Sequence, residues 1–114
     1  MIILETRLGK KIAVKLADLD WFEEYTRPSE ATIGVAIGTD RYEVKRDVED
    51  FRNLLAHAKI ETSKVISGDH DHYVIKKNVT HVTKTSSGNS VLCFRSGNRL
   101  SISVQFPPED FTGD

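Results

Sequence analysis

The sequence lacks a second cysteine, a long apolar run and any marked excess of charge. Cys93 is the only cysteine among 114 residues, which excludes an intrachain disulfide and a thiolate metal cluster. The apolar start, residues 1–4, gives way at once to charged residues and is too short for a signal peptide or a membrane span. These absences predict an intracellular, cytoplasmic protein.

The balance of charge argues against a dedicated nucleic-acid binder. The chain has 16 basic and 17 acidic residues, a formal net charge of −1 and a pI near 6.4. A nucleic-acid-binding domain usually shows a basic excess. Hydrophobic residues at 39% and charged residues at 29% are typical of an ordinary globular protein. We therefore expect one soluble domain and do not expect nucleic acid as its partner.

The short motifs of common catalytic chemistry are also absent. The sequence contains no Gly-x-Ser-x-Gly elbow, no phosphate-binding P-loop and no dinucleotide fingerprint. Cys93 lies in the apolar run Ser90–Phe94. A buried thiol in such a run behaves as a small hydrophobe rather than as a nucleophile. We predict no enzyme activity, no catalytic residue and no cofactor.

The two halves of the chain repeat one pattern. Each half contains an apolar run, then a turn of small and polar residues, then a strand-like segment with alternating apolar residues. The turns are Gly38-Thr39-Asp40 and Ser96-Gly97-Asn98, rich in the residue types that tolerate the positive φ of such turns. At an offset of 58 or 60 the following pairs coincide: Ile33 and Val91, Arg41 and Arg99, Val44 and Ile102, Phe51 and Phe111.

This pattern predicts an α+β fold that is predominantly antiparallel β, in a single compact domain of residues 1–114. Two related β units, about 1–59 and 70–112, would be joined by a polar linker near 60–72. Alternation after each turn predicts half-buried antiparallel strands, one of them at Leu100–Gln105. In the first unit, Asp47 as N-cap and a following apolar stripe predict one helix at about 48–59, packed on that unit. The second unit has only a helical stub at Pro107–Phe111.

Two histidines and two aspartates lie close together in Ser67–Tyr73, SGDHDHY. In an extended segment, His70 and His72 would share one face. Two imidazoles at this spacing can bind a metal, but a catalytic zinc commonly needs a third protein ligand and an open position. We interpret the stretch as a polar hinge within the linker and predict no metal site. A metal-dependent enzyme using His70 and His72 is an alternative.

The candidate ligand-binding residues are Arg41, Arg99 and Trp21. The two arginines follow the two turns at equivalent positions, so an internal pseudo-twofold or an oligomer would place them symmetrically. Paired guanidinium groups near the backbone amides of a turn suit a phosphate or a carboxylate. Trp21 is expected in the core, or else as an aromatic anchor on a binding surface.

The first half also carries a set of apolar spacers and turn residues that one family shares: Met1-Ile2, Arg7-Leu8-Gly9-Lys10, Glu23-Glu24, Thr32-Ile33, Tyr42-Glu43-Val44-Lys45 and Val48-Glu49. In these positions the chain resembles the FlbD family of small flagellar proteins. It departs from that family in its second unit and in a longer loop at 26–30. The family has no catalytic residues, so the resemblance implies a small, β-rich interaction protein.

The leading interpretation is a small non-enzymatic binding protein of the inhibitor, immunity, ligand-sequestering or assembly type. Its partner would be a protein or an anionic small molecule. Because the second unit lacks a full helix, we expect a homo-oligomer whose second subunit covers apolar residues of that unit; these are Val91, Cys93, Leu100 and Ile102. A second alternative is a weak nucleic-acid-binding module that uses basic residues of the second half: Lys76, Lys77, Lys84, Arg95 and Arg99.

Overall fold

The computed structural model describes residues 1–25, 27–68 and 70–102. This part of the chain is α+β and mostly antiparallel β, as the sequence predicted. Its elements, in chain order, are β1 (Ile2–Glu5), β2 (Lys11–Val14), the 3-10 turn η1 (Leu16–Asp18), β3 (Trp21–Tyr25), β4 (Thr32–Ile37), β5 (Asp40–Val44), α1 (Val48–His57), β6 (Thr62–Ser67), β7 (His70–Ile75), the 3-10 turn η2 (Lys76–Asn78), β8 (Val79–Lys84), β9 (Ser90–Phe94) and β10 (Arg99–Ile102).

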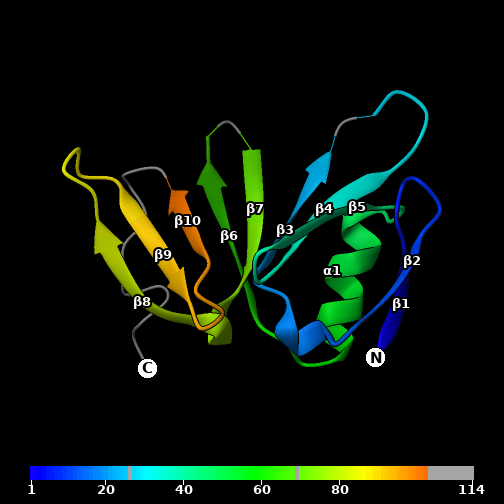
Figure 1. Ribbon diagram of the computed structural model, residues 1–114, viewed down its shortest axis with the longest axis horizontal. Coiled ribbons are helices and arrows are strands. Elements are labelled where there is room, and N and C mark those ends of the chain that lie inside the picture. Colours follow the sequence, from blue (N-terminus) through cyan, green and yellow to red (C-terminus); the bar gives the residue numbers. More distant parts are fainter. Residues whose placement is uncertain (26, 69, 103–114) are drawn as a thin grey trace.

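A central five-stranded sheet, in the order β5-β4-β3-β7-β6, connects the two ends of the molecule. The three-stranded sheet β10-β9-β8 lies at one end, and α1 with the β1–β2 hairpin lies at the other (Figure 1). All pairings in these sheets are antiparallel, and β3 in the middle places Trp21 between Ala36 of β4 and Val74 of β7. The molecule is therefore elongated, measuring 40 × 29 × 23 Å.

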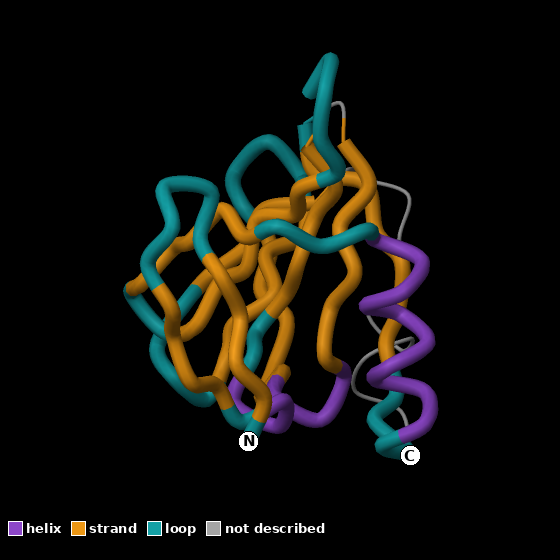
Figure 2. Tube along the Cα trace, turned by 90° about the vertical axis from the view of Figure 1, so that its right-hand side faces the viewer, coloured by secondary structure: helices purple, strands orange, loops and turns teal. Residues whose placement is uncertain are grey.

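The first core fills the space between one face of the central sheet, α1 and the β1–β2 hairpin. Phe22 of β3 and Phe51 of α1 are completely buried there, with their rings edge to face at a centroid distance of 4.9 Å. Such an arrangement suits the ring quadrupoles. Figure 2 shows the helix as an outer layer against the strands. The buried residues of its apolar stripe, Val48, Phe51 and Leu55, belong to the first core.

Helix α1 begins where the sequence predicted and ends slightly earlier. The side chain of Asp47 accepts hydrogen bonds from the backbone N–H groups of Glu49 and Asp50, which would otherwise lack a partner. The helix ends at His57, and Lys59 adopts a positive φ of 60°. A left-handed residue at this place is a common way to terminate a helix. Among the described residues, no helix is long and apolar enough to cross a membrane.

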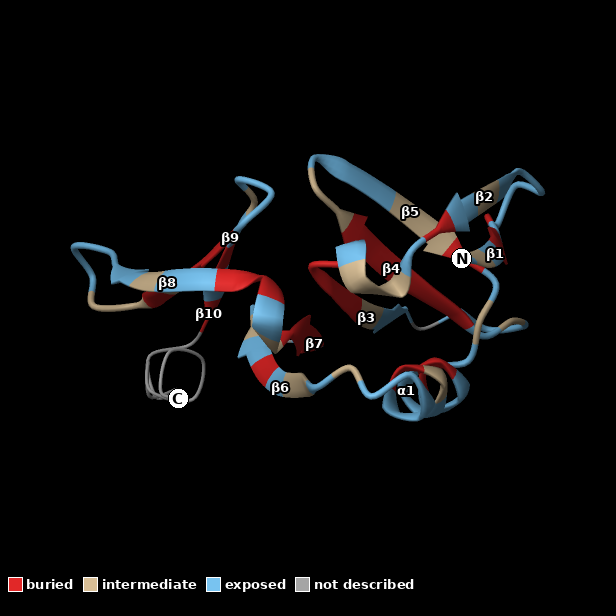
Figure 3. Ribbon diagram, turned by 90° about the horizontal axis from the view of Figure 1, so that it is seen from below, coloured by how far each residue is buried: buried red, intermediate tan, exposed pale blue. Residues whose placement is uncertain are grey.

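The second core lies between the other face of the central sheet and the three-stranded sheet. Trp21 packs on Phe94 there, with ring centroids 5.2 Å apart. Strand β4, which contributes to both cores, is almost wholly buried (Figure 3).

The second core corrects the reason we gave for an oligomer. Cys93, Leu100 and Ile102 are 5%, 8% and 3% exposed within a single chain. The central sheet covers Leu100 and Ile102 on the inner face of the three-stranded sheet, which the sequence suggested a second subunit would do. Val91 and Cys93 belong to the other face of β9, where Val91 is half-buried. The argument from Leu100 and Ile102 is therefore wrong, and the homo-oligomer stays a prediction.

The segment near 60–72 was wrongly expected to be a polar linker. It forms β6 and the start of β7, and these strands complete the central sheet. Gly68, with a φ of 62°, lies in the turn between them. Three parts of the prediction lie outside the described residues. They are the end of the strand Leu100–Gln105 beyond Ile102, the helical stub at Pro107–Phe111 and the end of the second unit.

Candidate functional site

Asp20 joins the β4–β5 turn to the β9–β10 turn. Its side chain is buried, at 2% exposure. Oδ2 accepts hydrogen bonds from the backbone N–H of Gly38 at 3.2 Å, the hydroxyl of Ser96 at 2.7 Å and the amide of Asn98 at 3.2 Å. A buried carboxylate needs such donors to replace its lost hydration. The two turns that the sequence singled out therefore meet at one buried charge.

Asn98 connects the two arginines that the sequence predicted as ligand-binding residues. Its side-chain oxygen accepts from Nη2 of Arg41 at 2.9 Å and from the backbone N–H of Arg99 at 3.1 Å. The Arg41 guanidinium also lies over the Trp21 ring, 4.6 Å from its centroid. Arg41 and Trp21 are thus in direct contact, while the Arg99 side chain is exposed at the start of β10. Ligand binding by these three residues stays a prediction.

The second half of the described chain carries a strong local excess of positive charge. From His72 to Pro108 the sequence contains no aspartate or glutamate. The basic residues of this segment are Lys76, Lys77, Lys84, Arg95 and Arg99. All are exposed except Lys76, which is half-buried and 4.0 Å from Glu61. The net charge of the whole chain conceals this segment because the acidic residues lie elsewhere.

The positive charges lie toward both ends of the three-stranded sheet. At one end, Nη2 of Arg95 donates to the backbone carbonyl of Lys77 at 3.3 Å, so the β9–β10 turn lies against η2. Lys84 ends β8 at the opposite end. Between them, the exposed side chains of Thr83 and Ser101 belong to the outer face of the sheet. Hydroxyl and basic side chains together are the groups that bind phosphate oxygens.

His72 forms a buried ion pair instead of lying in a hinge. It is 6% exposed, and its Nε2 is 2.6 Å from Oε2 of Glu23. Its Nδ1 faces the backbone carbonyl of His70 at 3.1 Å. Both partners are acceptors, an arrangement that favours the ring with a proton on each nitrogen. Both ring nitrogens of His72 already have protein partners, so a metal bound by His72 would have to displace one of them.

The ion pair shifts the pKa values of both partners. Burial alone would lower the pKa of His72, but the hydrogen bond and charge of Glu23 outweigh it and raise the pKa above the ordinary 6.5. The hydrogen bond from His72 lowers the pKa of Glu23 below the ordinary 4.5, against the effect of burial. The stabilisation from His72 is therefore complete below pH 6.5 and is lost as pH rises through its raised pKa. The contribution of Glu23 is present above pH 4.5 and is lost as pH falls through its lowered pKa.

We expect His72→Gln to destabilise the protein at mildly acidic pH, with a smaller effect at mildly alkaline pH. The glutamine cannot carry the charge that pairs with Glu23, and wild type itself loses that charge as pH rises. Urea unfolding of both proteins across this pH range measures the difference in free energy of unfolding. His70→Gln is the control, because His70 is exposed. A difference that does not change with pH would contradict the ion pair.

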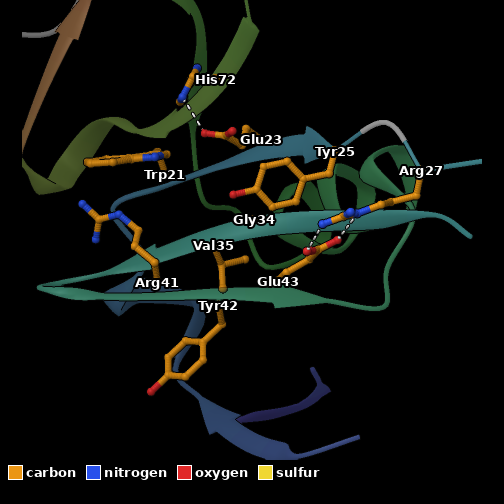
Figure 4. A pocket seen from close by; sticks show the side chains of 10 residues that line it. All are labelled: Trp21, Glu23, Tyr25, Arg27, Gly34, Val35, Arg41, Tyr42, Glu43 and His72. Atoms are coloured by element: carbon orange, nitrogen blue, oxygen red, sulfur yellow. Dashed lines mark hydrogen bonds and ion pairs between the residues drawn. The ribbon is translucent and has the colours of Figure 1, made fainter. Parts of the chain in front are cut away.

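Beside this ion pair, an open trough of about 500 Å³ lies on the central sheet. Its walls include Trp21, Glu23 and Arg41, and the ring of Tyr25 lies over Gly34 (Figure 4). A Cβ on Gly34 would be only 2.6 Å from the Tyr25 hydroxyl, so the absence of a side chain there permits this position of the ring. The trough is a second candidate site, which sequence reasoning approached only through Trp21 and Arg41.

Comparisons with known proteins add a fold neighbour. No family model matches the sequence, and no curated protein matches it. Among solved structures, the chain is similar to a LytTr DNA-binding domain from Bacillus cereus, part of a protein described as a methyl-accepting/DNA response regulator. The TM-score is 0.59 at 16% sequence identity, over 99% of this chain and 96% of that chain. At this identity the likeness shows a shared fold.

This neighbour corrects our ranking of functions. We ranked a protein- or small-molecule-binding protein first and did not expect nucleic acid as a partner. The neighbour is a DNA-binding domain, which favours the alternative of a nucleic-acid-binding module and is at odds with the leading interpretation. The ranking was misled by the net charge of the whole chain, which is close to zero, whereas the segment between His72 and Pro108 has basic residues and no acidic ones. None of the comparisons bears on the FlbD resemblance, which stays a prediction.

Proposed function

We propose that this chain is a DNA-binding module that contacts the phosphate backbone of a duplex with the basic part of its second half. The separation of charge carries the proposal: five basic residues and no acidic residue lie between His72 and Pro108. The fold, which resembles that of a DNA-binding domain, supports it. Basic side chains on phosphates supply most of the sequence-independent affinity of such proteins. The proposal includes no catalytic step and places the protein inside the cell, with cytoplasmic DNA as its target.

The dimensions of the three-stranded sheet suit a duplex groove. Lys84 is five residues beyond Val79, where β8 begins next to η2. At about 3.3 Å per residue, these positions are roughly 17 Å apart. The major groove is about 12 Å wide. Lys77 and Arg95 at one end of the sheet and Lys84 at the other can therefore contact phosphates on opposite sides of a groove.

We expect the double variant Lys76→Ala/Lys77→Ala to bind duplex DNA more weakly and with a smaller dependence on salt. Each phosphate contact contributes about −0.9 to the slope of log K against log salt concentration, so the slope should become less negative by up to about two units. Fluorescence anisotropy of a labelled duplex at several salt concentrations measures it. The loss should be similar for different DNA sequences, because phosphate contacts carry no sequence information.

A second lysine pair provides the matched control. Lys10 and Lys11 lie on the β1–β2 hairpin at the other end of the molecule and are exposed. The variant Lys10→Ala/Lys11→Ala loses the same charge and should keep the salt slope of wild type. If both double variants weaken DNA binding equally, the binding depends on net charge alone and not on the basic residues of the second half. If wild type shows no salt-dependent binding to duplex DNA, the proposed function is wrong.

We also propose that the two halves are related structural units. The support is the order of elements, which is a hairpin, a 3-10 turn and a three-stranded meander in both halves: β1-β2-η1-β3-β4-β5 and β6-β7-η2-β8-β9-β10. On this proposal the second unit begins with β6 rather than near residue 70. In an experimental structure the two units should superpose with Arg41 over Arg99, and backbone paths that diverge at these residues would contradict the relation.

A further inference from the structure

The trough on the central sheet contains a carboxylate oxygen that is free to bind a ligand. Oε2 of Glu23 faces His72 at 2.6 Å. In the described part of the chain, no protein group donates to its second oxygen, Oε1. Because the pKa of Glu23 is lowered, this carboxylate is ionised at neutral pH. A half-buried, ionised oxygen that lines a cavity is a strong acceptor for a ligand N–H group.

The floor of the trough offers a flat aromatic surface. The ring of Tyr25 lies over Gly34 and keeps 38% of the residue exposed (Figure 4). Burial, together with the charges of Glu23 and Glu43, raises the pKa of its hydroxyl, so the phenol stays neutral. The volume of about 500 Å³ is within the usual range for small-ligand sites, roughly 300–1,000 Å³. A planar ligand can therefore stack on Tyr25 while its edge faces Glu23.

The charges around the trough favour a neutral ring with an anionic group over a cationic ligand. His72, Arg41 and Arg27 supply positive charge, against two carboxylates. One of these, Glu43, is already paired with Arg27, with an oxygen 2.6 Å from Nη2. A ligand guanidinium or ammonium would meet an excess of like charge. A phosphate on the ligand would instead be attracted by Arg41, which has no carboxylate partner among the described residues, whereas Arg27 is held by Glu43.

We propose that this trough binds a guanine nucleotide. In guanine, the ring N1–H and the exocyclic 2-amino group are adjacent; one can donate to Oε1 of Glu23 and the other to the lone pair of Oε2 that His72 does not use. The base stacks on Tyr25, and the phosphate lies toward Arg41, at the Trp21 end of the trough (Figure 4). Adenine presents no such pair of donors, and hypoxanthine presents only the ring N–H. The inference does not depend on DNA binding, because the trough lies on the central sheet, whereas the proposed DNA contacts are made by basic residues around the three-stranded sheet.

Isothermal titration with GMP, IMP and AMP, in the absence of DNA, tests the proposal. We expect saturable binding of GMP, about tenfold weaker binding of IMP, which lacks one hydrogen bond to a charged group, and still weaker binding of AMP. Glu23→Gln should weaken GMP binding by at least about tenfold. Glu24→Gln is the matched control, because its strand partner Ile33 faces the first core on the opposite side of the sheet. It should bind GMP as wild type does.

A second variant shows whether weaker binding by Glu23→Gln reflects loss of the ligand contact or loss of the Glu23–His72 ion pair. Gly34→Ala leaves the Glu23–His72 pair in place but moves the Tyr25 ring, because the new Cβ would lie 2.6 Å from its hydroxyl. It should weaken GMP binding while thermal unfolding shows a cooperative transition. Absence of saturable GMP binding, equal binding of AMP and GMP, or equal losses in Glu23→Gln and Glu24→Gln would overturn the assignment. The DNA assay is separate, so either proposal can fail without the other.

Discussion

Replacing Phe51 by alanine is expected to lower the free energy of unfolding by about 3–5 kcal/mol. Phe51 is fully buried in the first core and packs edge to face on Phe22. The substitution leaves a cavity in the first core, between α1 and the central sheet. A helix of 10 residues depends on such packing, since isolated helices of this length are marginal in water.

Chemical denaturation of wild type and variant measures this loss. Leu54→Ala is a control on the same helix, because Leu54 is only half-buried and should cost less. A midpoint for Phe51→Ala close to that of wild type would mean that the apolar stripe of α1 is not a structural element of the first core.

Replacing Asp20 by alanine is expected to cost roughly 1.5–3 kcal/mol. The substitution removes an acceptor from three donors, the backbone of Gly38 and the side chains of Ser96 and Asn98. The donors are half-buried or exposed, so water can replace part of what they lose, but the alanine also leaves the buried site of the carboxylate empty. Both turns lose their common anchor, so the effect should exceed that of an ordinary surface substitution.

Asp18→Ala is the matched control for this prediction, because Asp18 is exposed two residues earlier in η1. It should change the unfolding free energy by no more than about 0.5 kcal/mol. Similar losses for the two aspartates would contradict the account of Asp20 as the anchor of both turns.

The sequence predicted those parts of the fold that depend on local patterns. The N-cap at Asp47 and the apolar stripe through Phe51 located α1, and the turn at Gly38 located the β4–β5 hairpin. In contrast, the stretch around His72 looked like a linker, because serine, aspartate and histidine are common in loops. It becomes a strand because Glu23, far away in the sequence, supplies the partner that lets His72 be buried.

The sequence identified the candidate sites only in part, again because they depend on contacts between segments that are far apart in the sequence. Trp21 and Arg41 were named from the sequence and do line the trough. Their connection to Arg99 through Asn98, and the anchoring of both turns by Asp20, depend on contacts between segments that no local pattern relates. The basic surface was hidden by a net charge taken over the whole chain, although its residues were named as an alternative.

The most direct test of the proposed function is a map of backbone amide chemical shifts during titration with a duplex DNA. The proposal predicts that the largest changes occur in η2, at the end of β8 and in the β9–β10 turn, around Lys77, Lys84 and Arg95. Changes confined to α1 and the β1–β2 hairpin, or no changes at low salt, would contradict it.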